Sequence, residues 1–306
     1  MKVLVLGGNG FIGSNIVAKL QLQGAEVIVA GRKTALQSNQ LQVKMQNMQQ
    51  VSDWLPMINS VEVVINSVGI LRERKAESYK GIHTYAVKSL AEACAQINIR
   101  LIHISAIGLS ANAKSGFITS KYWGEQAILA SGANAVIVRA SLLDGEGGFG
   151  AKWFRRVASW PIQFVMQSPG LVAPFQVGDL GDLGDAVATL ALKNLQTPNI
   201  VEPSIVELGG SEILSIPAYL QLLRLRDGKQ KAFQLDAPKW LVRMISHIFD
   251  VFALTPLSFG HFELMQGKNV PVINWLPLLL KRAPTLVGKI QAKTSKKEAL
   301  NLIANT

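Results

Sequence analysis

Short apolar runs alternate with longer amphipathic segments along the first two thirds of the chain. Apolar runs of about four to eight residues predict buried strands, because parallel strands covered on both faces read as nearly continuous apolar stretches. Seven such runs occur, at residues 3–6, 25–32, 41–45, 61–69, 100–108, 134–141 and 205–210.

Segments with a helical spacing of apolar residues fill most of the intervals between these strands. They follow the first strand directly and recur at residues 51–58, 79–97, 118–130, 151–160 and 179–195. Strands that alternate with helices in this way predict an α/β fold, a doubly wound parallel sheet with right-handed crossovers.

The regular alternation weakens after Arg139. A glycine-rich stretch at 145–150 is followed by proline-broken apolar segments up to residue 174, and the last third is helical and apolar. We therefore predict a nucleotide-binding domain over residues 1–210, with substrate-lobe segments inserted after about residue 139. A smaller, mostly helical lobe would occupy residues 211–306.

The turn after the first strand carries three glycines. Gly7, Gly10 and Gly13 have G-x-x-G-x-x-G spacing, with Asn9, Phe11 and Ile12 between them. In a dinucleotide site the first glycine allows the tight turn, the second lets the backbone approach a pyrophosphate, and the third lets the helix pack closely on the sheet. The helix amino terminus would then face the phosphates. The spacing predicts a Rossmann-type dinucleotide site, and the alternative is an ordinary strand-to-helix turn.

The end of the second strand bears on the choice of cofactor. An NAD site usually has Asp or Glu there for the ribose 2′-hydroxyl, whereas arginine suits a 2′-phosphate. This chain has Arg32 and Lys33 at that point and no carboxylate. The pattern favours NADP(H) over NAD(H), and the alternative is two solvated cations on a loop.

The chain is strongly basic, with a formal net charge of +11. That balance is compatible with nucleic acid, an anionic membrane surface, or an anionic cofactor or substrate. Aromatic residues do not interleave with the basic clusters, and no nucleic-acid module is recognisable. We expect no nucleic-acid partner.

The cysteine and histidine residues do not predict a disulfide or a metal site. The one cysteine, Cys94, excludes a disulfide framework within the chain, and its helical context predicts a small buried residue in a protein of the cytoplasm. The four histidines His83, His103, His247 and His261 lack a metal-ligand spacing, so no metal site is expected. The first apolar stretch lacks the flanks of a signal peptide, and no apolar run is long enough to predict a transmembrane helix.

The glycine spacing with Phe-Ile in its second gap resembles the extended and atypical branches of the short-chain dehydrogenase/reductase superfamily. The resemblance covers about the first 210 residues. It implies that Ser67, Val68 and Gly69, after the fourth strand, lie along the cofactor. It also implies that Ser105, in HISAIG, is the family serine and Lys121 the family lysine, each near the cofactor.

The family tyrosine is missing. With Lys121 in the lysine position, the Tyr-x-x-x-Lys pattern places Phe117 where the tyrosine belongs, and a phenyl ring cannot transfer a proton. Tyr122 neighbours Lys121 and points to another helix face. Three alternatives follow: a proton from Ser105, Tyr85 or water; cofactor binding without turnover; or a shifted helix.

Further segments resemble one atypical branch, that of an accessory subunit of respiratory complex I and its bacterial relatives. They are GGNGFIG, AGR, VVINSVGIL, HISAIG, the Ser-Lys-x-x-x-Glu helix, VIVRAS, residues 174–182, and HFELMQGKNV at 261–270. The resemblance implies a protein that binds NADP(H) and is either non-catalytic or, like other members of the branch, of unknown activity.

The last third also suggests a lipid-facing surface. Residues 239–257 and 272–284 combine long apolar runs, tryptophans and flanking cations. Such segments form interfacial helices, walls of an apolar-ligand pocket, or core helices of a lobe. A peripheral membrane contact at the inner face, or a contact within a protein complex, is therefore an alternative to a purely cytoplasmic protein.

Three functions remain open. The first is an NADP(H)-dependent oxidoreductase acting on an apolar carbonyl or quinone-like compound. The second is a non-catalytic structural, assembly or redox-sensing protein that binds the cofactor. The third is a sugar-nucleotide epimerase or dehydratase, which the missing tyrosine and the apolar last third disfavour.

Overall fold

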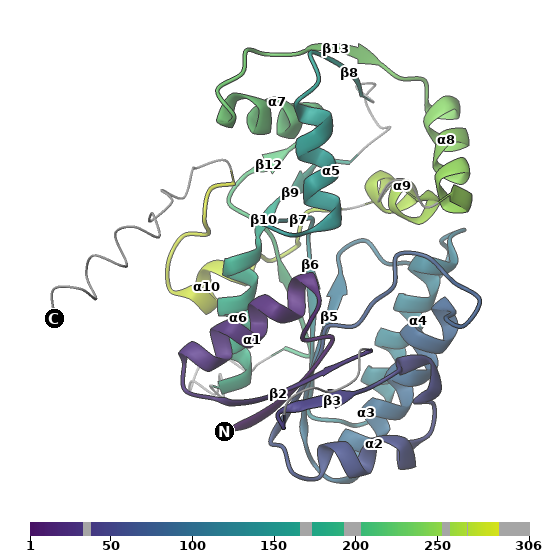
Figure 1. The fold of residues 1–306 in the computed structure, drawn as a ribbon, viewed down its shortest axis with the longest axis vertical. Coiled ribbons are helices and arrows are strands. Elements are labelled where there is room, and N and C mark those ends of the chain that lie inside the picture. Colours follow the sequence, from purple (N-terminus) through teal and green to yellow (C-terminus); the bar gives the residue numbers. More distant parts are fainter. Residues whose placement is uncertain (33–37, 166–172, 193–202, 253–257, 268, 288–306) are drawn as a thin grey trace, which may run out of the picture.

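A seven-stranded sheet forms the centre of the protein in its computed structural model (Figure 1). The structure describes residues 1–32, 38–165, 173–192, 203–252, 258–267 and 269–287. All neighbouring strands of the sheet are parallel. Their order is β11 (Ile205–Leu208), β6 (Ala135–Ala140), β5 (Arg100–Ala106), β4 (Val63–Asn66), β1 (Lys2–Leu6), β2 (Glu26–Gly31) and β3 (Gln40–Gln42). The predicted doubly wound α/β fold is confirmed.

Successive residues of β1 face opposite cores, as the period of two along a strand requires. Val3 and Val5 lie in one core and Leu4 and Leu6 in the other. The first core is covered by α1 (Phe11–Leu22), α6 (Leu180–Leu192) and α10 (Leu276–Leu280). The second is covered by α2 (Val51–Ile58), α3 (Ala86–Gln96) and α4 (Gly116–Ala130). Cys94 of α3 is fully buried, as predicted, and burial raises the pKa of its thiol to about 12.

Two predicted elements differ locally from the structure. The strand predicted over 41–45 is shorter in the structure, where β3 ends at Gln42. Val43 and Met45 turn away from the sheet edge into the core, and Met45 begins the 3₁₀ turn η1 (Met45–Asn47). The long helix predicted over 79–97 begins as a π-helical turn, η2 (Lys80–Tyr85), before α3. π-Turns frequently mark functional sites, and η2 packs directly on α4.

A second group of elements lies beyond the carboxyl ends of the strands, at the top of Figure 1. It contains α5 (Phe149–Ala158), α7 (Ile216–Arg226), α8 (Lys239–Phe252) and α9 (Phe259–Gln266). Three short strand pairs accompany them: β7 (Leu143–Asp144) with β10 (Gly178–Asp179), β9 (Phe175–Gln176) with β12 (Ile213–Leu214), and β8 (Ile162–Val165) with β13 (Phe233–Asp236). The group combines segments from before residue 211 (α5, β7 to β10) with segments after it, and its core gathers around Tyr219 and Leu223.

The apolar segment 272–284 returns to the sheet layer. Leu276 and Leu279 of α10 are buried against the core shared with α6, and Arg282 donates to the buried carboxylate of Asp182 at 2.6 Å. Of the alternatives predicted for this segment, these contacts favour core packing. Within the described part of the chain, no helix is both long and apolar enough to span a bilayer.

Candidate dinucleotide and catalytic site

The turn between β1 and α1 leaves no room for side chains at its first and third glycines. Gly7 has a φ of +77°, which side chains rarely adopt. A Cβ at Gly13 would overlap the Gly7 carbonyl oxygen and lie 2.7 Å from the Ser67 hydroxyl oxygen. Gly10 is the N-cap of α1 and offers no side chain to its first turn. The N–H groups of that turn therefore remain available to an anion.

A pocket of about 280 Å³ opens beside this turn. Seven of the predicted cofactor residues line it: Gly7, Asn9, Gly10, Arg32, Ser67, Val68 and Gly69. The other lining residues are Leu6, Ala30, Gly31, Val43, Met45, Ile70, Glu77 and Ile82. The predicted residues Phe11 and Ile12 lie elsewhere: a Cβ built at Gly148 would be 2.7 Å from the Phe11 ring, and Ile12 packs on the core.

Arg32 lies at the rim of this pocket in an ion pair that the sequence pattern did not indicate. Its Nη1 donates to both carboxylate oxygens of Glu77, each at 3.1 Å. Arg32 is largely exposed, whereas Glu77 is mostly covered. Exposed ion pairs contribute little free energy, so an anionic ligand can take the guanidinium from Glu77 at low cost. Lys33 lies outside the described residues.

The segment after β4 is held by buried polar side chains. Ser67 donates to the Leu6 carbonyl at 2.7 Å, and the Asn66 Oδ1 accepts the Val68 N–H at 3.0 Å. The Asn66 amide Nδ2 then faces His103 Nδ1 at 3.2 Å, so the amide donates and this imidazole nitrogen accepts. These bonds fix the backbone that lines one wall of the pocket.

His83 of η2 fastens the same wall to α4. Its Nε2 accepts the Ile70 N–H at 3.0 Å, and its Nδ1 lies 3.0 Å from the Ser120 hydroxyl. Burial, and to a lesser extent the Lys121 ammonium, hold the His83 pKa well below its usual value. The same two causes lower the pKa of His103 to about 3. Both imidazoles are neutral at pH 7 and serve as hydrogen-bonding struts.

These neutral histidines predict acid lability. Below about pH 6.5 the unfolded chain protonates its histidines, whereas folded His103, with a pKa of about 3, does not. The free energy of unfolding is therefore unaffected by this histidine above about pH 6.5, and it decreases as the pH falls from there toward 3. We expect a loss of up to about 1.4 kcal/mol per pH unit for each such histidine. Urea unfolding at a series of pH values measures it.

His103→Gln isolates this contribution, because a glutamine oxygen can still accept the Asn66 amide hydrogen. Its unfolding free energy should depend less steeply on pH than that of the wild type. The matched control is His247→Gln, since His247 is exposed on α8. An unchanged slope in His103→Gln would contradict the assignment.

Ser105 and Lys121, the predicted catalytic residues, do not line this pocket. Ser105, at the end of β5, is buried, and its Oγ has no hydrogen-bond partner among the described residues. A Cβ placed on Gly69, which lines the pocket, would lie 3.6 Å from Lys121 Nζ. Burial lowers the pKa of Lys121, while the Glu125 carboxylate one turn on opposes this. A buried hydroxyl without a partner is expected where a ligand supplies the missing hydrogen bond.

Phe117 lies in an aromatic cage. Its ring is buried against Tyr79 and His83, with centroids 5.8 and 5.9 Å away, and Lys121 Nζ lies 5.6 Å from its centroid. The nearest of the paired rings is His261 of α9, at 5.1 Å. At the position where the resemblance predicts the catalytic tyrosine, the Phe117 ring therefore packs against other aromatic side chains.

His261 was predicted only as one of four dispersed histidines. The adjoining Glu263 accepts the N–H groups of Lys114 and Ser115 at 2.7 and 2.8 Å, which ties α9 to the start of α4. Burial lowers the His261 pKa to about 4. The Ser258 hydroxyl lies 2.6 Å from Nδ1. The same hydroxyl accepts the His261 backbone N–H at 3.2 Å, so Ser258 holds both the backbone and the ring of His261.

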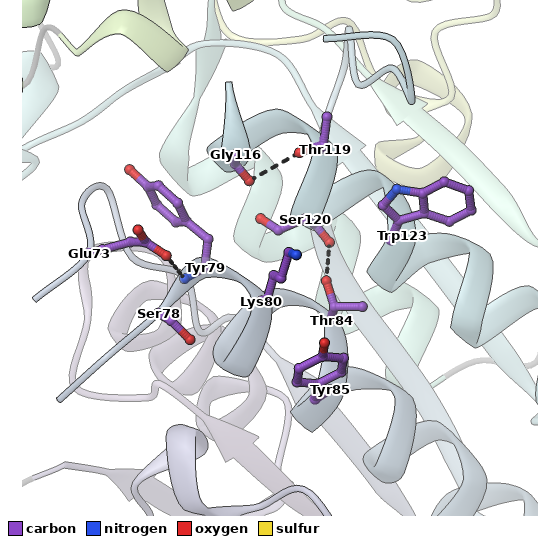
Figure 2. A pocket seen from close by; sticks show the side chains of 10 residues that line it. All are labelled: Glu73, Ser78, Tyr79, Lys80, Thr84, Tyr85, Gly116, Thr119, Ser120 and Trp123. Carbon is purple, nitrogen blue, oxygen red and sulfur yellow. Dashed lines mark hydrogen bonds between the residues drawn. The ribbon is translucent and has the colours of Figure 1, made fainter. Parts of the chain in front are cut away.

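Tyr85, one of the predicted proton sources, belongs to a different pocket. This pocket, about 720 Å³ in volume, lies on the outer side of η2 and α4, where Tyr85 and Trp123 are exposed (Figure 2). Neither Ser105 nor Lys121 lines it. Tyr122 packs edge-on against Trp123 at 5.3 Å. The exposure of Tyr85 and its place in this other pocket give no support to Tyr85 as the proton source.

Comparison with known proteins gives relatives of two kinds. Residues 1–107 match the family described as RmlD substrate binding domain. Subunit 9 of the NADH dehydrogenase [ubiquinone] 1 alpha subcomplex, a mitochondrial protein of Dictyostelium discoideum, is 25% identical over 269 residues, which are 82% of this chain and 71% of that protein. The ceramide reductase of Caulobacter vibrioides is 24% identical over 238 residues, 74% of each chain.

Solved structures with the same fold include sugar-nucleotide enzymes. A nucleoside-diphosphate-sugar epimerase from Staphylococcus aureus has a TM-score of 0.70 at 12% identity and covers 94% of this chain and 98% of its own. The UDP-glucuronic acid 4-epimerase of Bacillus cereus, solved with UDP-glucuronic acid and NAD, has a TM-score of 0.63 at 18% identity, over 94% and 95% of the two chains.

Proposed function

We propose that this chain, an atypical member of the extended short-chain dehydrogenase/reductase superfamily, binds NADP(H) and reduces a carbonyl group of an apolar, lipid-like compound. One observation carries the proposal. The buried Ser105 hydroxyl lacks a partner among the described residues at the end of β5, the strand next to the one whose loop lines the dinucleotide pocket. Packing alone gives no reason to bury a hydroxyl in this way.

The residues around the glycine turn fit a dinucleotide. Gly13 and Gly7 let the backbone lie where a pyrophosphate would approach, and the uncapped first turn of α1 supplies N–H donors. Arg32, released from Glu77, would hold a 2′-phosphate. Gly69 brings the pocket wall to Lys121, whose ammonium would bind the ribose of the nicotinamide half.

NADPH, when bound, supplies the hydride that the carbonyl carbon accepts. The Ser105 Oγ–H would donate a hydrogen bond to the carbonyl oxygen and give up its proton as the alcohol forms, and water would return that proton to the serine. The Lys121 ammonium stabilises the developing negative charge at that oxygen. The apolar ring of Phe117 excludes water from one side of the site.

An apolar substrate is supported by two features. The buried ring of Phe117, next to Lys121, is apolar, and α9, whose His261 faces Phe117, follows the apolar helix α8 in the chain. The relative from Caulobacter vibrioides is named a ceramide reductase. We therefore place ketone-bearing, ceramide-like lipids first in the substrate panel, with quinones second.

Turnover tests the chemistry. We expect Ser105→Ala to lower kcat for NADPH-dependent reduction about tenfold, because the carbonyl oxygen loses its hydrogen-bond donor, with a much smaller effect on KM. The matched control is Ser131→Ala, since Ser131 lies at the far end of α4. Equal loss in both variants, or an unchanged kcat in Ser105→Ala, would contradict the role of Ser105.

Calorimetry tests the cofactor. We expect Arg32→Ala to weaken NADPH binding about tenfold and to leave NADH binding within about twofold, because only NADPH carries the 2′-phosphate. Glu77→Gln should keep or strengthen NADPH binding, since it frees Arg32 from its ion pair. If wild-type protein binds NADH as tightly as NADPH, the preference for NADP(H) is wrong.

Two other functions keep specific support. Phe117 in the acid position favours a cofactor-binding protein without turnover, and the relative from Dictyostelium discoideum is named as a subunit of NADH dehydrogenase. The shared fold with sugar-nucleotide epimerases keeps UDP-sugars in the panel. NADPH that stays bound and unoxidised across ketones, quinones and UDP-sugars would favour the non-catalytic function.

A further inference from the structure

The two-stranded ribbon of β8 and β13 has its apolar side turned to solvent. Ile162 pairs with Phe233, and Phe164 pairs with Leu235. Their exposed fractions are 51%, 66%, 68% and 38%, respectively. Side chains alternate between faces along a strand, so these four residues share one face. Two phenyl rings and two aliphatic side chains thus form a continuous exposed apolar surface, which we name the apolar ribbon face.

The opposite face of the ribbon is polar and anchored. Gln163 is fully buried and donates to the Ala158 carbonyl at 3.1 Å, at the end of α5. Gln234 donates to Gln163 Oε1 and to the Pro217 carbonyl of α7, both at 3.0 Å. A one-residue slip would bury the phenyl rings but break these amide bonds. The inward glutamines therefore hold the apolar face outward.

The surface continues into α8, which begins three residues after β13. Trp240, Met244 and Ile248 are exposed at intervals of four residues and so lie along one helix face. A second exposed tryptophan, Trp160, directly precedes the ribbon. Tryptophans at the margins of an apolar surface are typical of the boundary between lipid and water.

Cations dominate the rim of this surface. Lys229 and Lys231 precede β13, and Lys239 and Arg243 lie on α8, and all four are exposed. Arg224 fixes the loop that carries the first two lysines, because its guanidinium donates to the Gln230 carbonyl and to the Ser159 carbonyl next to Trp160. Within residues 227–247 the acidic residues are Asp227 and Asp236, fewer than the four cations, so the rim is net positive and complements an anionic surface.

We propose that the apolar ribbon face and the exposed stripe of α8 dock this protein on an anionic phospholipid bilayer. Phe164, Phe233 and Trp240 would enter the interface between headgroups and acyl chains. The lysines beside them would contact phosphates. This inference stands on the second lobe alone and does not rest on the proposed function.

Vesicle co-sedimentation of the full chain tests the docking. We expect binding to vesicles of phosphatidylcholine mixed with phosphatidylglycerol, weakened by salt, and little binding to phosphatidylcholine alone. The double variant Phe164→Ser, Phe233→Ser should bind the mixed vesicles at least about tenfold more weakly. A second variant, Trp240→Ser with Met244→Ser, should also bind more weakly. Since these side chains are exposed, melting temperatures should change little.

The matched control is Leu22→Ser with Leu129→Ser, which removes two exposed leucines from the nucleotide-binding layer. Its vesicle binding should equal that of the wild type. The proposal would be overturned if the wild type did not bind the mixed vesicles, or if the Phe164→Ser, Phe233→Ser variant bound them as tightly as the wild type. The wild type could instead form a dimer that does not bind vesicles and that the ribbon substitutions dissociate. This result would assign the apolar ribbon face to contact with a second copy of the chain and would also overturn the proposal. NADPH titration of each variant keeps this outcome separate from that of the dinucleotide site.

Discussion

Replacing Phe117 with tyrosine is expected to raise NADPH-dependent carbonyl reduction about 100-fold, the lower end of what a positioned general acid contributes. The residue lies one helical turn before Lys121, whose Nζ is 5.6 Å from the ring centroid. A phenol at this position would have a cation nearby to lower its pKa. Stopped-flow oxidation of NADPH in the presence of a ketone lipid measures the change.

Two further variants interpret that result. Phe117→Leu keeps the position apolar and should show no gain, while Tyr122→Phe removes a phenol on another helix face and should leave turnover unchanged. A buried hydroxyl that finds no partner costs stability, so the melting temperature of Phe117→Tyr reports whether the new phenol accepts a hydrogen bond from Lys121 or exchanges one with Ser105. Normal NADPH binding with no gain in Phe117→Tyr would mean that the missing acid does not limit this site.

Much of the fold follows from local sequence. The buried runs of β1 and most of β4 are apolar on both faces, and alternation with helices leaves few topologies for such strands. Elements that form through contacts between distant segments are harder to predict from local sequence. The β8 and β13 ribbon joins segments about 70 residues apart, and its inward glutamines reverse the usual polarity, so periodicity alone does not place it.

The candidate site likewise contains residues that local sequence predicts and residues that distant contacts bring in. The glycine turn and Arg32 were predictable, because each is defined by its position at the end of a strand. Glu77, the partner of Arg32, comes from a loop 45 residues later. His261 reaches Phe117 through long-range contacts, among them the hydrogen bonds by which Glu263 ties α9 to the start of α4. No local pattern encodes such long-range contacts. One signal for His261 was available, the segment 261–270 singled out by its resemblance to the complex I branch.

Replacing Gly13 with alanine is expected to weaken NADPH binding about 100-fold. The new methyl group would overlap the Gly7 carbonyl oxygen and press on the Ser67 hydroxyl 2.7 Å away. Over-packing of this kind costs about 1–3 kcal/mol, and here the strain falls on the turn that must approach the pyrophosphate. Isothermal titration with NADPH measures the loss.

Two glycine variants separate this effect from general damage. A methyl group at Gly150 on α5 meets nothing within 4 Å, so Gly150→Ala should bind NADPH as the wild type does. A Cβ at Gly10 would lie 3.1 Å from the Gly7 carbonyl oxygen, a milder contact at the pocket wall. Gly10→Ala should therefore fold and bind NADPH with intermediate affinity even if Gly13→Ala is too unstable to measure. Wild-type affinity in both Gly10→Ala and Gly13→Ala would place the dinucleotide elsewhere, because neither methyl group could then lie against the bound phosphates.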